Sequence, residues 1–524
     1  MSNDNYKLIF IGLDGGTYDV IERFIKNNKL KTFEAILREG ARGRLSSTIP
    51  PISPSAWTSI FTGVNPGKHG VYGFVKEDEN THFLIPITSK DRRCDSIWDI
   101  TSKYGKRIIA MNIPLSYPPD EVEGVMSSGL GTPSIRSKFV FPESFREFII
   151  KKFPDFDVDF DEDELIDNPK KLLNKIRKVT SAEIDLCKYL LENEEWDLFI
   201  FVFRALDVIQ HFFWNKTEIL VEFYEIFDKL LDYIIYNIIN DGNDNIILLI
   251  SSDHGFNDLS TIVYLNNWLE SFDLLRYKKI RKRGRLVNAE KIQKVMLKFH
   301  LKKLTRRLKG KKFLKFLLNI IPSESIGYIY NIDWAQTKAY FSEATYGIHI
   351  INVKNRKEYE SIRERIIRES NQLIDPVNGE NIVKKIYLRE ELYNGEYADA
   401  GADIVFLKKE NYRFVGGYNT QGEILVKTRK EIGDHNEENG ILFVYGNDIK
   451  EEYTIKEVNV YDILPTILHV LQIPIPPYID GQVLRNIFKE KSNLARRSIY
   501  YTTNNSEEER IRRKIKILKT SHKL

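Results

Sequence analysis

The sequence predicts an α/β protein: a three-layer α/β/α sandwich with a mostly parallel central sheet and an inserted helical cap. Three apolar runs predict buried strands, and each leads to an aspartate: 8–13 to Asp14, 198–203 to Asp207 and 246–250 to Asp253. Near-continuous apolar runs of this length are typical of strands that are covered on both faces. Strand patterns alternate with helix patterns, which favours a parallel sheet between two helical layers.

The elements of the first half follow one another in this alternation. In chain order we expect a strand to Asp14, a helix over 18–40, a helix after Ser53, a strand over 107–113, a helix around 181–191, a strand over 198–203, a helix over 219–239 and a strand over 246–250. Strand-like runs resume at 338–341, 347–353, 403–406 and 441–445. The sequence therefore divides into a first core part (1–264), a basic helical cap (265–335), a second core part (336–490) and a charged C-terminal tail (491–524).

Composition bounds the class of protein. With 524 residues, 42% hydrophobic and 29% charged, the chain is long enough for a large globular core. Its two cysteines, Cys94 and Cys187, lie far apart in sequence, which excludes a disulfide framework and fits a reducing compartment. No signal-peptide core precedes the first strand, and no apolar run approaches the roughly 20 residues of a membrane helix. We therefore expect a cytoplasmic protein.

The predicted cap is strongly basic. Between residues 276 and 315 there are 18 lysines and arginines against one acid, Glu290, although the whole chain carries only +4. Apolar residues recur among these cations, so the segment is either a helical cap packed on the body or, over 276–318, a peripheral contact with an anionic membrane. No nucleic-acid-binding signature accompanies it, so no nucleic-acid partner is expected. The sequence does not predict an oligomeric state.

Two histidines lie close behind two of the strand-end aspartates. His211 is four residues after Asp207, and His254 directly follows Asp253. The carboxyl ends of parallel strands meet at one edge of a sheet, where α/β proteins place ligands and metals. Carboxylates and imidazoles gathered there predict a metal-dependent enzyme.

Ser53 begins a second informative segment. Pro54 suits the first position of a helix, which would make Ser53 its N-cap. The free N–H groups and the dipole of a helix N-terminus favour an anionic alkoxide or a phosphate.

The ordered motifs resemble the alkaline phosphatase superfamily. The resemblance rests on Asp14, on Ser53 followed by Pro-Ser-Ala-Trp-Thr-Ser-Ile-Phe-Thr-Gly-Val-Asn-Pro-Gly-Lys-His-Gly, on Asp207 to His211, on residues 252–256 (Ser-Asp-His-Gly-Phe) and on residues 433–435 (Gly-Asp-His). It is strongest to the type I phosphodiesterase and nucleotide pyrophosphatase branch, in particular its predicted prokaryotic phosphohydrolase and phosphomutase members. It extends from residue 7 to about residue 487.

The resemblance implies two divalent metal ions. One site would be formed by Asp14, Asp253 and His254 with Ser53 Oγ, and the other by Asp207, His211 and His435. Mixed carboxylate and imidazole ligands suit zinc, which we expect first, or manganese or iron. Two such ions clamp an in-line phosphoryl displacement.

The implied activity is phosphohydrolysis of a phosphodiester or pyrophosphate. Ser53 would attack phosphorus, a phosphoseryl intermediate would form, and water would release it, with retained configuration at phosphorus. The substrate would be a small-molecule or a lipid-linked phosphoester.

Two departures keep alternatives open. The better-known nucleotide pyrophosphatases usually have Thr where this chain has Ser53, and they carry an Asn shortly after the His-Gly pair, where this chain has residues 71–74 (Val-Tyr-Gly-Phe). Asn112 and Lys68 are then candidates for the missing phosphate donor. A sulfatase is disfavoured because Ser53-Pro54-Ser55-Ala56 does not match the Cys/Ser-x-Pro-x-Arg setting of that family. A phosphotransferase similar to phosphoglycerate mutase, and a membrane-surface enzyme acting on lipid-linked phosphates, remain alternatives.

Overall fold

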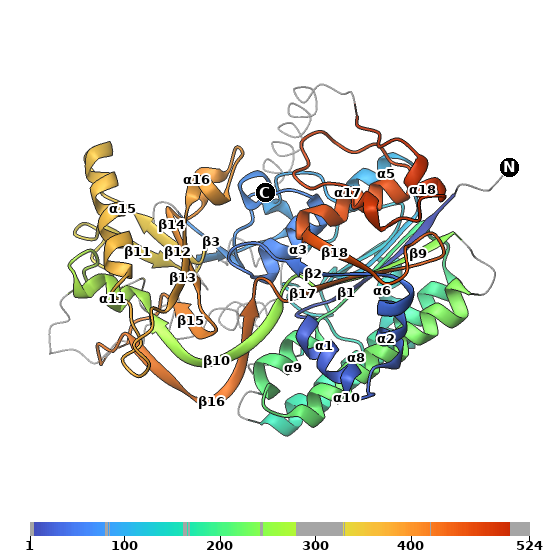
Figure 1. Ribbon diagram of the computed structural model, residues 1–524, viewed down its shortest axis with the longest axis horizontal. Coiled ribbons are helices and arrows are strands. Elements are labelled where there is room, and N and C mark those ends of the chain that lie inside the picture. Colours follow the sequence, from blue (N-terminus) through green and yellow to red (C-terminus); the bar gives the residue numbers. More distant parts are fainter. Residues whose placement is uncertain are drawn as a thin grey trace.

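The computed structural model describes most of the chain (Figure 1). It describes residues 5–502 except 79–81, 83, 161–164, 166–167, 241–244, 279–328, 330 and 420. Most of the predicted basic cap, including the greater part of the 276–318 segment, therefore lies outside the described residues. Much of the predicted C-terminal tail does too.

A nine-stranded sheet forms the centre of the larger unit. From one edge to the other its strands are β18 (Tyr453–Asn459), β2 (Ala41–Ser46), β17 (Gly440–Tyr445), β9 (Ile246–Ser251), β1 (Lys7–Leu13), β8 (Leu198–Phe203), β5 (Ile108–Ile113), β6 (Gly124–Ser128) and β7 (Val140–Phe141). The five strands from β9 to β6 are parallel to one another, whereas β17 and β7 run antiparallel to their neighbours. The prediction of a mostly parallel α/β sheet is confirmed.

Helices cover both faces of this sheet (Figure 1). One layer contains α1 (Tyr18–Lys26), α2 (Lys31–Glu39), α6 (Ser144–Lys152), α8 (Pro169–Asn193), α9 (Ala205–Phe213) and α10 (Thr217–Ile234). The other contains α3 (Ser53–Thr62), α5 (Ile97–Lys103) and α17 (Ile463–Val470). Side chains alternate across a strand, so β1 sends Ile9 and Ile11 into the first core and Leu8 and Phe10 into the second. This is why its sequence is apolar at every position.

Two helices differ from their predicted extent. The helix expected over 18–40 is two helices, because the backbone of Asn28 adopts a left-handed conformation (φ 57°) and ends α1. Asparagine tolerates this conformation better than most residues do. The helix expected around 181–191 is the C-terminal half of α8, which begins much earlier, at Pro169, with the side chain of Asn168 as its cap.

The described residues between 255 and 436 form a second unit, here called the inserted unit, which lies beside the nine-stranded sheet (Figure 1). Its three-stranded sheet has the order β15 (Asn411–Val415), β10 (Gly255–Tyr264) and β16 (Leu425–Asn436). Its four-stranded sheet has the order β11 (Ala339–Ser342), β12 (Gly347–Ile350), β14 (Ile404–Lys408) and β13 (Val383–Leu388). Helices α11 (Leu265–Ser271) and α15 (Arg356–Ser370) pack with them around a separate apolar core. Of the strands that begin after residue 336, β17 and β18 join the nine-stranded sheet.

Shorter elements complete the connections. They are β3 (Val75–Glu77), β4 (Leu84–Pro86), α4 (Pro66–His69), α16 (Arg389–Leu392) and α18 (Asn493–Arg496). In the part of the chain that the structure describes, no helix combines the length and the apolar character that crossing a membrane requires.

Candidate active site

The three strand-end aspartates meet at one edge of the nine-stranded sheet. Strand β1 lies between β9 and β8 and is parallel to both. Asp14 and Asp253 follow β1 and β9, and Asp207 lies in the first turn of α9, shortly after β8. Parallel strands end on the same side of a sheet, so the three carboxylates converge there.

Asp14, Asp253 and His254 form a first buried group. Each contributes one potential ligand atom, and these atoms lie within 4.8 Å of one another. His254 Nε2 lies 3.2 Å from Asp253 Oδ2 and 3.9 Å from Asp14 Oδ1. The hydroxyl of Ser53 joins the group, because its Oγ lies 3.2 Å from His254 Nε2. The structure thus brings together the four residues that the family resemblance assigned to one metal.

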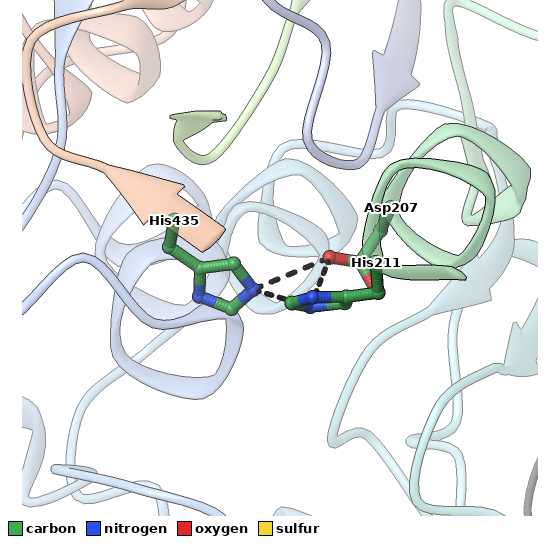
Figure 2. A group of neighbouring side chains, drawn as sticks. All are labelled: Asp207, His211 and His435. Atoms are coloured by element: carbon green, nitrogen blue, oxygen red, sulfur yellow. Dashed lines mark hydrogen bonds and ion pairs between the residues drawn. The ribbon is translucent and has the colours of Figure 1, made fainter. Parts of the chain in front are cut away.

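Asp207, His211 and His435 form the second group (Figure 2). His211 Nε2 and His435 Nε2 are 2.9 Å apart, and they lie 3.4 Å and 3.3 Å from Asp207 Oδ1. Helix α9 supplies Asp207 and His211 one turn apart, as the spacing predicted, and β16 supplies His435.

Backbone carbonyls orient all three imidazoles. The Nδ1 atoms of His211, His254 and His435 lie 3.2, 3.2 and 3.0 Å from the carbonyl oxygens of Gly433, Gly255 and Pro51. A carbonyl oxygen only accepts, so each Nδ1 carries the proton and donates it. Burial lowers the pKa of His254 and of His435 to about 4, so both rings are neutral near pH 7. Each Nε2 lone pair is therefore available to a metal, an arrangement typical of metal-binding histidines.

The carboxylates also have oxygens that fit a cation. Asp14 Oδ2 accepts from Trp57 Nε1 (3.0 Å) and Asp253 Oδ1 accepts from Gly15 N–H (3.2 Å). Asp14 Oδ1, Asp253 Oδ2 and Asp207 Oδ1 are buried and accept no hydrogen bond from any residue that the structure describes. Buried oxygens in this state are costly unless something else satisfies them.

The electrostatics of the first group also favour a bound cation. Burial raises the pKa of Asp253 to about 7, with the Asp207 carboxylate adding to the shift. Burial, then the carboxylates of Asp253 and Asp207, raise the pKa of Asp14 as well. Such crowding of negative charge is what a divalent ion relieves. Both groups therefore fit a divalent metal ion.

Ser53 lies at the start of helix α3. The helix begins at Ser53 itself, so Ile52 rather than Ser53 is the N-cap, one residue from the predicted boundary. Ile52 has an extended backbone, and its carbonyl accepts the first helical hydrogen bond, from Ala56 N–H. The Ser53 side chain is consequently free of capping and directed to His254.

The two candidates for a phosphate donor face elsewhere. Asn112 Nδ2 donates to Glu183 Oε1 (2.9 Å), because the left-handed backbone of Asn112 (φ 56°) at the end of β5 directs its side chain to α8. Lys68 Nζ contacts the Tyr478 carbonyl and the carboxylate of Asp480. Each of these side chains is engaged in a local contact that sequence spacing does not reveal.

A cavity of about 230 Å³ adjoins the second group. His211 and His435 form part of its wall, together with residues 49–52 that precede Ser53. The rest of its lining includes Phe74, Phe341, Glu343, Tyr346, Phe406, Lys408, Arg413, Phe414 and Asp434. Sequence reasoning missed these residues. Strands were expected at 338–341 and 403–406, which carry Phe341 and Phe406, but β15 was not expected, and no local pattern shows which face of β14 meets the site.

Comparisons with known proteins agree with this geometry. The family model described as type I phosphodiesterase / nucleotide pyrophosphatase matches residues 8–437. A solved structure of murine ectonucleotide pyrophosphatase / phosphodiesterase 5, an inactive variant in complex with AMP, is similar with a TM-score of 0.53 and 12% identity, over 92% of this chain and 100% of that chain. Phosphonoacetate hydrolase from Sinorhizobium meliloti 1021, in complex with phosphonoformate, is similar with a TM-score of 0.53 and 14% identity, over 90% and 96%. None of the curated proteins matches the sequence.

Proposed function

The chain belongs to the type I phosphodiesterase and nucleotide pyrophosphatase family of the alkaline phosphatase superfamily and is a phosphoester hydrolase, and we propose that it cleaves a phosphodiester or pyrophosphate bond through a phosphoseryl intermediate on Ser53. The observation that carries the proposal is the 3.2 Å distance between Ser53 Oγ and His254 Nε2. This distance supports the proposal because the Ser53 hydroxyl, the proposed nucleophile, lies next to the potential ligand atoms of the first group.

Each group would hold one divalent ion. Asp14, Asp253 and His254 would bind the first with Ser53 Oγ, and Asp207, His211 and His435 the second. The pair of ions supplies charge stabilisation for the attacking and departing oxygens. The imidazole and carboxylate donors suit zinc, which is the metal we propose, ahead of manganese or iron.

The protein's own residues account for the two displacements. Ser53 Oγ forms a bond to phosphorus as the bond to the leaving oxygen breaks, and water then breaks the bond between Ser53 and phosphorus. Helix α3 presents Ser53 from its first turn, where the helix dipole favours the developing negative charge. The burial of Ser53, of which 3% is exposed, limits the access of competing water.

The test is trapping of the intermediate. Metal-loaded protein is mixed with bis-p-nitrophenyl phosphate, quenched in acid and analysed by peptide mass spectrometry. Attack on this diester releases one p-nitrophenolate, so we expect a p-nitrophenylphosphoryl adduct on the peptide that contains Ser53. Ser53→Ala should give neither adduct nor turnover while its metal content, measured by plasma mass spectrometry, remains that of the wild type. Turnover of Ser53→Ala at the wild-type rate would exclude Ser53 as the nucleophile.

A second assay separates the phosphotransferase alternative. The same preparation is incubated with 3-phosphoglycerate, and the products are resolved by phosphorus NMR. Isomerisation of 3-phosphoglycerate without diester cleavage would replace the hydrolase proposal by a mutase-like function. Cleavage of the diester without isomerisation supports the proposal.

A further inference from the structure

The cavity beside the second group combines two kinds of wall. Much of its lining is aromatic or aliphatic, from Phe74 of the larger unit and from Phe341, Phe406 and Phe414 of the inserted unit. Its charged part comes from two neighbouring strand regions, with Lys408 at the end of β14 and Arg413 in β15. A ligand in this cavity would touch both units and would also lie against His211 and His435.

One carboxylate holds both cations. Arg413 Nε and Nη2 donate to Asp434 Oδ1 at 2.9 and 2.5 Å, and Lys408 Nζ lies 2.7 Å from Asp434 Oδ2. Asp434 directly precedes His435. The cluster of Lys408, Arg413 and Asp434 therefore carries one net positive charge next to the second group.

The unused hydrogen-bonding capacity of this cluster consists of donors. The contact of Lys408 with Asp434 lacks hydrogen-bond geometry, and the buried Nζ makes no hydrogen bond to any residue that the structure describes. Arg413 uses Nε and Nη2 for its bonds to Asp434, and its Nη1 makes no hydrogen bond to any residue that the structure describes. The other acid of the wall, Glu343, accepts a hydrogen bond of 2.7 Å from Gly416 N–H. Since a buried ammonium donor such as Lys408 Nζ requires an acceptor, a ligand in this cavity should present an oxygen atom to it.

We propose that Lys408 and Arg413 form a specificity site for an anionic oxygen group, a carboxylate or a phosphoryl, carried by the substrate beyond the phosphorus that reacts. The inference rests on the proposed function, because the phosphoryl group must lie at the two metal-binding groups for the cavity to receive the rest of the substrate. The aromatic walls would hold the carbon chain or ring that joins the two anionic ends.

A competing explanation is structural. The ion pairs could serve only to hold β14 and β15 against β16 and so to keep His435 in place. In that case the loss of Lys408 would weaken the binding of every ligand of the site equally. A matched pair of ligands separates the two roles, because only a recognition role depends on whether the ligand carries the second anion.

The experiment uses 3-phosphonopropionate and propylphosphonate, which differ in a terminal carboxylate. Their binding to the metal-loaded full-length protein is measured by calorimetry. A hydrogen-bonded charge contact contributes about 1.5–3 kcal/mol, so we expect the carboxylate ligand to bind about 10- to 100-fold more tightly. Lys408→Met should remove most of this preference, and Lys408→Arg should retain part of it.

Lys409→Met is the matched control. Lys409 is the next residue, and its Nζ lies 3.2 Å from Glu380 and not in the cavity wall. This variant should keep the full preference for 3-phosphonopropionate. Metal content and thermal unfolding of every variant show that the fold and the metal groups remain.

Three outcomes would overturn the proposal. The first is equal binding of the two ligands by the wild type. The second is an undiminished preference for 3-phosphonopropionate in Lys408→Met, and the third is an equal loss of affinity for both ligands in that variant. Calorimetry needs no turnover, so the absence of a phosphoseryl adduct would contradict the proposed function without deciding this comparison.

Discussion

Trp57 Nε1 donates a hydrogen bond of 3.0 Å to Asp14 Oδ2, and Trp57 lies one helical turn after Ser53 on α3. One helix thus carries the proposed nucleophile and also holds a carboxylate of the first group in place. The hydrogen bond uses Oδ2, so Oδ1 is the Asp14 oxygen that remains for a metal ion. Partners of this kind orient ligands and tune metal affinity.

Trp57→Phe should weaken metal binding at the first group. Phenylalanine keeps part of the aromatic packing on Phe10 and Phe61 but lacks the N–H that fixes Asp14. Loss of such a partner typically lowers metal affinity by about 10- to 100-fold. Competition with a chromogenic zinc chelator measures the affinity. Trp98→Phe is the control, because Trp98 Nε1 donates to Asp120, away from the metal groups.

Gly12→Ala should destabilise the protein because the added Cβ would clash with Trp57. A Cβ atom at Gly12 would lie 2.7 Å from Trp57 Cη2 and 3.0 Å from Val202 Cγ2. Overpacking of this kind costs about 1–3 kcal/mol, which should lower the thermal unfolding midpoint. In the Trp57→Phe background the cost should shrink, because phenylalanine lacks the Cη2 atom. A double-mutant cycle measures this coupling, and additive effects would contradict it.

Glu183→Gln should change how stability depends on pH. Burial raises the pKa of Glu183 from 4.5 to about 8, against the lowering effects of Arg204 and Asn112. Between these values the folded protein binds a proton that the unfolded chain releases, so wild-type stability should fall as pH rises from about 4.5 to about 8. Glutamine cannot ionise. The stability of the variant should therefore rise relative to that of the wild type at the upper end of this pH range, by about a few kcal/mol at most.

Thermal unfolding at pH 5.5 and pH 8.5 measures this difference. Asp185→Asn is the control, because Asp185 is an exposed carboxylate on the same helix, α8. An identical pH dependence of wild type and Glu183→Gln would show that Glu183 is not the group responsible.

Removal of metal should lower stability, and single histidine variants should lose metal stepwise. Chelation leaves the buried oxygens of Asp14, Asp207 and Asp253 without a partner among the described residues. We expect a lower unfolding midpoint after dialysis against EDTA and its recovery on addition of zinc. His254→Ala and His435→Ala should each reduce the metal content from two equivalents to one. An unchanged metal content in both variants would contradict the two-group assignment.

Most of the site residues at the edge of the central sheet could be predicted from sequence, because the patterns that mark them are local. Asp14 and Asp253 end apolar runs, and Asp207 and His211 are one helical turn apart, so each position follows from a few neighbouring residues. Parallel pairing then brings these residues to the same edge. His435 was assigned through the resemblance alone, because its surroundings in the sequence are an ordinary polar segment.

The cavity could not be predicted because it depends on pairings across the chain. Asp434 of β16 meets Arg413 from its own three-stranded sheet and Lys408 from the four-stranded sheet of the inserted unit. Strand patterns indicate which residues alternate, but they do not indicate which sheet a strand joins. The Glu183 side chain illustrates the same limit, since its partner Asn112 is 71 residues away.

Strand β16 pairs antiparallel with β10, and His435 lies opposite Phe256, two residues after His254. Asp207 and His211, in contrast, belong to α9, which packs in the apolar core on one face of the nine-stranded sheet. An ion bound by Asp207, His211 and His435 would consequently connect the two units.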